Sequence, residues 1–141
     1  METVFFFRGL STYGGDDARF SVFNFGPMYK NFERAFRARD LDFRPVTGMG
    51  AGTLAEVTAR ALEFLDKDEV FRSGRPVHFC GHSAGGLIAR LALAELSGRI
   101  PNGKVASLLT IATPNRGSKL AQVCIDLPAS RRSRSLRWLE A

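Results

Sequence analysis

Apolar and polar residues follow one another along the chain in blocks that predict strands separated by helices. Four short runs that are rich in apolar residues predict strands, and the continuous apolar run at residues 4–7 has the character of a strand buried on both faces of a sheet. The four runs cover residues 4–7, 41–46, 76–80 and 105–111. Because helical segments alternate with these runs, we expect a parallel sheet with right-handed crossover connections.

The segment 26–40 predicts an amphipathic helix between the first two strands. Pro27 suits the first turn of a helix, where a backbone N–H is not needed. Charged residues gather on one side of the helix, and the other side carries Met28, Phe32, Ala35 and Phe36.

A second helix is predicted to begin after Thr53 and to end near residues 73–74. Thr53 and Glu56 form the T-x-x-E pattern of a capping box. An apolar stripe follows them, made of Leu54, Val57, Ala61, Leu62 and Leu65. The segment 87–96 predicts a third helix that is apolar on nearly every side and therefore well buried, ending at Gly98.

The length of 141 residues and the apolar fraction of 45%, with twelve Phe, suit a single domain with a substantial core. We expect this domain to cover residues 1–126, with a last short helix over 118–126. Residues 127–141 form a tail with four Arg and one Glu, which supplies half of the net charge of +6. A basic tail can bind nucleic acid or anionic lipid. No recognition motif supports such binding elsewhere, so we expect a solvated, poorly ordered tail and no nucleic-acid partner.

Several classes of protein find no support in the sequence. Two cysteines, Cys80 and Cys124, do not make a disulfide framework, and Cys80 fits a buried strand. No cluster of metal ligands is visible, so we expect neither a metal nor a cofactor. No run approaches the roughly 18 apolar residues of a membrane helix, and the N-terminus lacks the basic region of a signal peptide. We therefore expect no integral membrane segment and a cytoplasmic location.

The strongest chemical signal is GHSAGG at residues 81–86, which contains Gly-x-Ser-x-Gly between a predicted strand and a predicted helix. This pattern is typical of a nucleophile elbow, a tight and strained turn that presents a serine above the sheet. Gly81 and Gly85 fit such a turn, because strand and helix converge there and leave no room for side chains. The N–H groups at the start of the following helix favour an oxyanion. Ser83 is therefore the candidate nucleophile.

Around this motif the chain resembles a known family. The segments VFFFRGL, PVHFCGHSAGGLIARLAL and VASLLTIATPNRGSKLA are similar to the lipase and esterase branch of the α/β-hydrolases. They resemble bacterial triacylglycerol lipases and the group that includes GPI inositol-deacylases, over about residues 3–124. The resemblance implies a partial α/β-hydrolase fold. Its four parallel strands would lie in the order 2-1-3-4, with helices on both faces and the active site at the carboxyl ends of the strands.

The resemblance also implies an oxyanion hole made of two backbone N–H groups. One belongs to Ala84, directly after Ser83. The other belongs to Leu10, which follows Arg8-Gly9 where the family has a His-Gly pair. Because the donors belong to the main chain, the change of side chain need not remove the hole. In the same way, the family's TPHRGS segment is TPNRGS in this chain.

The general base of this mechanism is missing from the expected place. In this fold the order along the chain is Ser, then Asp or Glu, then His. No histidine follows Ser83, and the acidic residues after it are Glu95, Asp126 and Glu140. His78 and His82 precede Ser83 or adjoin it, and we expect both to be structural. Asp16 and Asp17 lie in the loop after the first strand and are expected to be solvated.

The sequence therefore predicts a serine carboxylic-ester hydrolase of the lipase or esterase type, acting by acyl transfer on a small-molecule or lipid ester. Without its acid and base it is expected to be truncated and weakly active. The alternative is a non-catalytic domain that binds an apolar ligand. A nucleotide site at GMGAGT is disfavoured, because its spacing is not G-x-G-x-x-G. The oligomeric state stays open, although an uncovered edge strand at 105–111 invites association.

Overall fold

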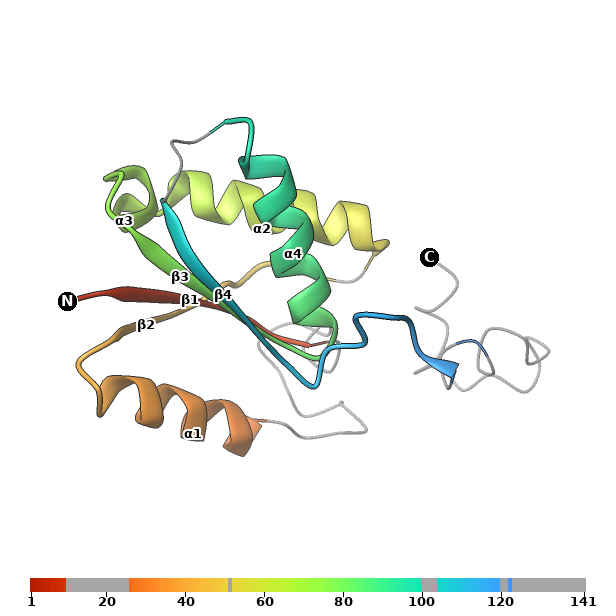
Figure 1. The fold of residues 1–141 in the computed structure, drawn as a ribbon, viewed down its shortest axis with the longest axis horizontal. Coiled ribbons are helices and arrows are strands. Elements are labelled where there is room, and N and C mark those ends of the chain that lie inside the picture. The colour runs from red at the N-terminus through yellow and green to blue at the C-terminus, as the bar shows by residue number, and fades with distance from the viewer. Residues whose placement is uncertain (10–25, 51, 100–103, 120–121, 123–141) are drawn as a thin grey trace.

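The sheet is built as the sequence predicts. A computed structural model describes residues 1–9, 26–50, 52–99, 104–119 and 122. Its four strands are all parallel and lie in the order β2-β1-β3-β4 (Figure 1). The strands are β1 (Thr3–Phe7), β2 (Asp42–Pro45), β3 (Val77–His82) and β4 (Val105–Ile111). The expected α/β class and strand order are confirmed.

Helices cover both faces of this sheet, as expected. Helix α1 (Gly26–Arg37) lies on one face, and α2 (Leu54–Lys67), α3 (Glu69–Arg72) and α4 (Ala84–Leu96) lie on the other (Figure 1). The central strand β1 is buried along its whole length. Phe5 and Phe7 pack in the cluster with α2 and α4, whereas Val4 and Phe6 pack in the cluster with α1. This alternation follows from the period of two along a strand.

Helix α1 uses the predicted apolar stripe except at one position. Met28, Phe32 and Phe36 pack against the sheet as predicted. Ala35 is exposed, and Tyr29 is buried in its place at 5% exposure. The Tyr29 ring packs edge-on against Phe6, with ring centroids 5.6 Å apart. Its hydroxyl accepts a hydrogen bond from the Gly9 N–H at 3.2 Å. A tyrosine can bury its ring while its polar end finds a partner, and a small alanine gains little by comparison.

The capping box at Thr53 forms as predicted. The Glu56 N–H donates to Thr53 Oγ1 at 3.2 Å, and the Thr53 N–H donates to Glu56 Oε2 at 2.8 Å. Hydrogen bonding from the Thr53 backbone lowers the pKa of Glu56. The predicted first residue of the apolar stripe, Leu54, is 40% exposed because it lies on the outer side of the first turn.

The prediction of one helix from 54 to about 73 is wrong, because Asp68 divides it. Asp68 ends α2 with an extended backbone and caps α3, accepting hydrogen bonds from the Val70 and Phe71 N–H groups. Its other oxygen pairs with Arg44 of β2 at 2.9 Å. Arg44 also pairs with Asp42, and these two carboxylates raise its pKa. An aspartate favours a cap over a helix interior.

The expectation that the third predicted helix is buried on nearly every side is also wrong. In α4, Arg90, Leu91, Ala94 and Glu95 are exposed, and Leu91 is 39% exposed. The helix packs one face on the sheet and on α2, and the sequence contains more apolar residues than that face needs. Strand β4 lies at the edge of the sheet, where Leu109 is 51% exposed.

Two predicted features lie outside the described residues. They are most of the short helix over 118–126 and the tail over 127–141. Within the part of the chain that the structure describes, no helix has both the length and the apolar character needed to cross a membrane.

Candidate active site

Ser83 lies at the turn between β3 and α4, and its backbone is strained. It stands as the N-cap of α4 with φ 55° and ψ −131°. A residue with a side chain rarely adopts a positive φ, and such a conformation costs about 1–3 kcal/mol. The Ser83 N–H donates to the Ile111 carbonyl at 2.8 Å, which fixes the turn against the end of β4. Its hydroxyl makes no capping hydrogen bond to the helix.

The glycines on either side of Ser83 occupy positions with no room for a side chain. A Cβ on Gly81 would lie 2.6 Å from the Gly86 nitrogen, and one on Gly85 would lie 2.5 Å from the Arg8 carbonyl oxygen. Real Cβ atoms do not approach backbone this closely. The start of α4 therefore passes directly over the ends of β3 and β1. This crowding is the physical reason for the Gly-x-Ser-x-Gly spacing.

Gly86 is also crowded, but by a side chain and not by backbone, and the motif alone did not indicate this contact. A Cβ there would lie 2.8 Å from Cγ2 of Thr113, in the loop after β4. The loop is held by Asn115, whose side-chain oxygen accepts from Arg90 of α4 at 2.9 Å. Asn115 also donates to Thr110 Oγ1 at 3.4 Å. The TPNRGS segment is thereby tied to both α4 and β4 through the side chain of Asn115.

The loop after β1 reaches the Ser83 side chain. A Cβ on Gly9 would lie 2.8 Å from Cβ of Ser83 and 3.4 Å from its Oγ. The Gly9 N–H is held by Tyr29 of α1. From the sequence, Arg8-Gly9 was considered only as the pair that precedes the predicted oxyanion donor Leu10. Gly9 was not predicted to be a neighbour of Ser83. The predicted oxyanion donor Leu10 lies outside the described residues.

The predicted donor Ala84 is the first residue of α4 and is buried at 7% exposure. The neighbouring N–H groups of Ser83 and Gly86 bond to the carbonyls of Ile111 and Ser83. The first turn of α4 carries no acidic side chain. The positive end of the helix dipole therefore lies beside Ser83 without a nearby carboxylate on that turn to offset it.

His82 is packed among aromatic rings, although it adjoins Ser83 in sequence. It is 7% exposed, and its ring lies 5.9 Å from the Tyr29 ring and 6.3 Å from the Phe32 ring. Burial lowers the pKa of His82, because desolvation disfavours the charged imidazolium. The ring therefore belongs to the interface between β3 and α1. Asp16, Asp17 and Asp126 lie outside the described residues.

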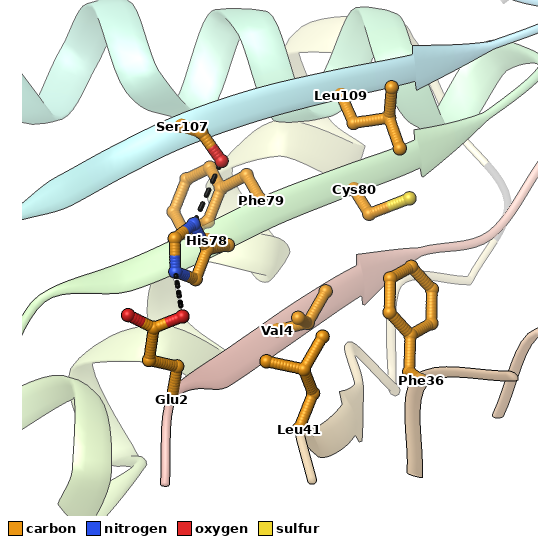
Figure 2. Close-up of a pocket in the computed structure, with 9 residues that line it drawn as sticks. All are labelled: Glu2, Val4, Phe36, Leu41, His78, Phe79, Cys80, Ser107 and Leu109. Atoms are coloured by element: carbon orange, nitrogen blue, oxygen red, sulfur yellow. Dashed lines mark hydrogen bonds and ion pairs between the residues drawn. The ribbon is translucent and has the colours of Figure 1, made fainter. Parts of the chain in front are cut away.

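A second polar group lies at the opposite end of the sheet. His78, at the start of β3, contacts Ser107 of β4 through Nδ1 at 2.8 Å and Glu2 through Nε2 at 3.3 Å (Figure 2). Sequence reasoning missed this group, because the three residues are far apart along the chain. They line a cavity of about 190 Å³. Buried Cys80 also lines it, and burial raises the pKa of this thiol to about 11.

Among the described residues, no three His, Cys, Asp or Glu side chains are grouped so that they could hold a metal ion. Comparison of the chain with known protein families, with curated proteins and with solved structures finds no match in any of the three. The assignment of a function therefore rests on the geometry around Ser83 and on the motif that produces it.

Proposed function

We propose that the chain is a serine carboxylic-ester hydrolase of the lipase or esterase type, with Ser83 as its nucleophile. The single observation that carries the proposal is the strained backbone of Ser83 between a buried strand and the N-terminus of α4. A plain glycine-rich turn has no need of a serine at φ 55°, where glycine is favoured. Strain of this kind is concentrated at functional sites.

The proposed reaction is acyl transfer. Ser83 Oγ attacks the carbonyl carbon of an ester, and its proton passes to a base. The carbonyl oxygen becomes an oxyanion that accepts hydrogen bonds from the N–H of Ala84 and, by the family resemblance, from that of Leu10. The alcohol leaves, and water then attacks the acyl-serine and releases the acid. The substrate class we propose is a small-molecule or lipid ester.

The base is the weak part of this scheme. The chain has only two histidines; His82 is packed against Tyr29 and Phe32, and His78 hydrogen-bonds Ser107. Removing the base of a serine hydrolase lowers turnover by about 10⁶, and about 10³ to 10⁴ over water remains from binding and the oxyanion hole. We therefore propose that the 141-residue chain turns over esters slowly.

The positions of the two histidines favour a second candidate, a non-catalytic domain that binds an apolar ligand. In that case the strained turn would be retained without use of the Ser83 hydroxyl. The two candidates differ in one property: the hydrolase makes Ser83 more reactive than an ordinary serine, and the binding domain does not.

Treatment with an alkyl fluorophosphonate tests this difference. Ser83 Oγ displaces fluoride from phosphorus, and the product stays attached to the tryptic peptide 73–90. Ser97 provides an internal reference, because it is an exposed serine in the separate peptide 91–99. We expect Ser83 to be modified faster than Ser97 and the modification to be absent in Ser83→Ala. Equal rates for the two serines would favour the binding domain.

A further inference from the structure

A second serine of this chain is already hydrogen-bonded to a histidine. Ser107 Oγ lies 2.8 Å from Nδ1 of His78, and Nε2 of His78 lies 3.3 Å from Oε2 of Glu2 (Figure 2). These three residues come from β4, β3 and the residue before β1. They lie at the amino ends of the strands, at the opposite end of the sheet from Ser83.

A local irregularity of the sheet puts Ser107 beside His78. Val77 pairs with Val105, but the next residue, His78, pairs with Ser107, so that Ala106 is an extra residue in β4. With uninterrupted pairing His78 would face Ala106, and Ser107 would point to the other face of the sheet. Bulges often re-aim a side chain next to an active site. The register shift is thus the reason that the two side chains meet.

The contacts on both nitrogens favour one tautomer of the His78 ring. The carboxylate of Glu2 can only accept a hydrogen bond, so it favours a proton on Nε2. Nδ1 of the neutral ring then carries the lone pair, and the Ser107 hydroxyl donates to it. This is the arrangement that a general base needs, with the carboxylate holding the ring and the ring accepting the serine proton.

The space beside this group suits a small apolar acyl group. The cavity of about 190 Å³ has apolar walls from Val4, Phe36, Leu41 and Leu109 (Figure 2). Ser107 is exposed and the His78 side chain is 25% exposed, so a ligand can reach both. Cys80 is the other nucleophile type in the cavity. With a pKa of about 11 it stays a thiol at neutral pH, and a thiol is a weak nucleophile.

We propose that Ser107 is a second nucleophile of this protein, with His78 as its general base, and that it reacts with small esters of short apolar acids. Ser107 Oγ bonds to the ester carbonyl carbon, and its proton passes to Nδ1 of His78. When the tetrahedral intermediate collapses, the carbon–oxygen bond to the alcohol breaks and the alcohol takes the proton from Nδ1. Water then hydrolyses the acyl-serine by the same steps, with His78 accepting the water's proton.

The rate at this site is expected to be modest. Ser107 lies within strand β4, without the strained turn and the helix N-terminus that Ser83 has. Loss of one oxyanion donor costs about 10² to 10³ in turnover. Glu2 is 71% exposed, so its ion pair with His78 adds little beyond the choice of tautomer. We therefore expect covalent reactivity to be easier to detect than ester turnover.

Mapping of fluorophosphonate adducts tests the proposal independently of Ser83. Ser107 lies in the tryptic peptide 105–116, apart from the peptides of Ser83 and Ser97. In this reaction the Oγ–P bond forms, the P–F bond breaks, and fluoride leaves as the proton passes to His78. In a Ser83→Ala background, we expect Ser107 to react about 10²-fold faster than Ser97, because a positioned base contributes about 10² to 10⁴.

Variants separate a base from a structural hydrogen bond. His78→Gln keeps a polar side chain at this position and should slow the modification of Ser107 about 10²-fold. Glu2→Gln changes an exposed residue and should slow it by up to about fivefold. Ser107→Ala should leave the peptide 105–116 unmodified. Circular dichroism confirms that each variant is folded.

Two results would overturn the proposal. One is a modification rate for Ser107 that is no higher than the rate for Ser97 in the Ser83→Ala protein, which retains His78. The other is an unchanged rate in folded His78→Gln. The rate at Ser107 is measured in the Ser83→Ala background and the rate at Ser83 in the unmutated protein, so failure here is distinguishable from failure of the proposed function.

Discussion

The two ends of β3 differ in what they provide for a nucleophile. At the carboxyl end, Ser83 has the strained turn and the helix N-terminus, but the neighbouring His82 packs against aromatic rings. At the amino end, Ser107 has a histidine at 2.8 Å, but it lies within a strand and has neither a strained turn nor a helix N-terminus. Presentation of a serine and activation of a serine are therefore separate properties. The first is built from glycines within a few residues, whereas the second needs contacts between distant strands.

The largest effect is expected from filling the space at the Ser83 end. Gly85→Ala would put a Cβ 2.5 Å from the Arg8 carbonyl oxygen, and the near atoms all belong to the backbone of Phe7 and Arg8, which cannot rotate away as a side chain could. We expect a loss of about 3 kcal/mol or more in the free energy of unfolding, measured by urea denaturation. Gly98→Ala is the matched control, because its Cβ would meet no atom within 4 Å. A Gly85→Ala protein as stable as the Gly98→Ala protein would show that position 85 has room for a side chain.

The next largest effect concerns the thiol at the His78 end. Burial raises the pKa of Cys80 from 9.0 to about 11, so the thiolate fraction at pH 8 falls about 100-fold. We expect iodoacetamide to alkylate the peptide 73–90 at least about 100-fold more slowly in the folded protein than in urea. Comparable alkylation rates in the folded protein and in urea would mean that the cavity beside His78 exposes a reactive cysteine. Cys80 would then be a better nucleophile in this cavity than Ser107.

The same substitution at the two serines should have opposite effects on stability. Ser83→Gly relieves a positive φ and should raise the free energy of unfolding by about 1 kcal/mol. Ser107→Gly places a glycine in a strand and removes the hydrogen bond to His78, so it should lower that energy by about 1 kcal/mol. Urea denaturation measures both. A destabilising Ser83→Gly would contradict the interpretation that strain is stored at this turn.

The smallest effect is a pH dependence that comes from His82. Its pKa is lowered from the usual 6.5 by burial, so the unfolded chain binds a proton first as the pH falls. The stabilising contribution of the neutral ring is fully present above pH 6.5 and decreases below it, until the lower folded pKa is reached. In His82→Phe, which keeps an aromatic ring beside Tyr29 and Phe32, this decrease should be absent. An identical fall in stability with pH in both proteins would show that His82 does not titrate in this way.

Much of the fold follows from local sequence patterns. The strands of the sheet and the Thr53 capping box depend on residues within a few positions of one another, and both are present. Predictions failed where long-range packing decided the outcome. Asp68 divides a helix because Arg44 and the N–H groups of α3 both bind it. Tyr29 replaces Ala35 in the buried stripe because Phe6 and Gly9 lie next to it.

In the candidate site, too, local features could be predicted from the sequence and features that depend on long-range contacts could not. The roles of Gly81, Ser83 and Gly85 could be predicted from the segment GHSAGG alone, because the lack of room for side chains arises where one strand and the next helix cross. The contact of Gly9 with Ser83 could not be found in this way, since it depends on how β1 lies beside β3. The pairing of His78 with Ser107 depends on a single register shift, which no local pattern indicates.

Adding a base from solution is the sharpest test of the proposal that the turn presents Ser83 as a nucleophile and that the missing part is the base. Imidazole added to the 141-residue chain should accelerate fluorophosphonate modification of Ser83 in the peptide 73–90 by at least about tenfold, since a positioned base contributes far more. The same imidazole should change the modification of Ser97 much less. If imidazole accelerates the modification of Ser83 and of Ser97 to the same extent, then the turn does not present Ser83 as a nucleophile, and the proposed function is wrong.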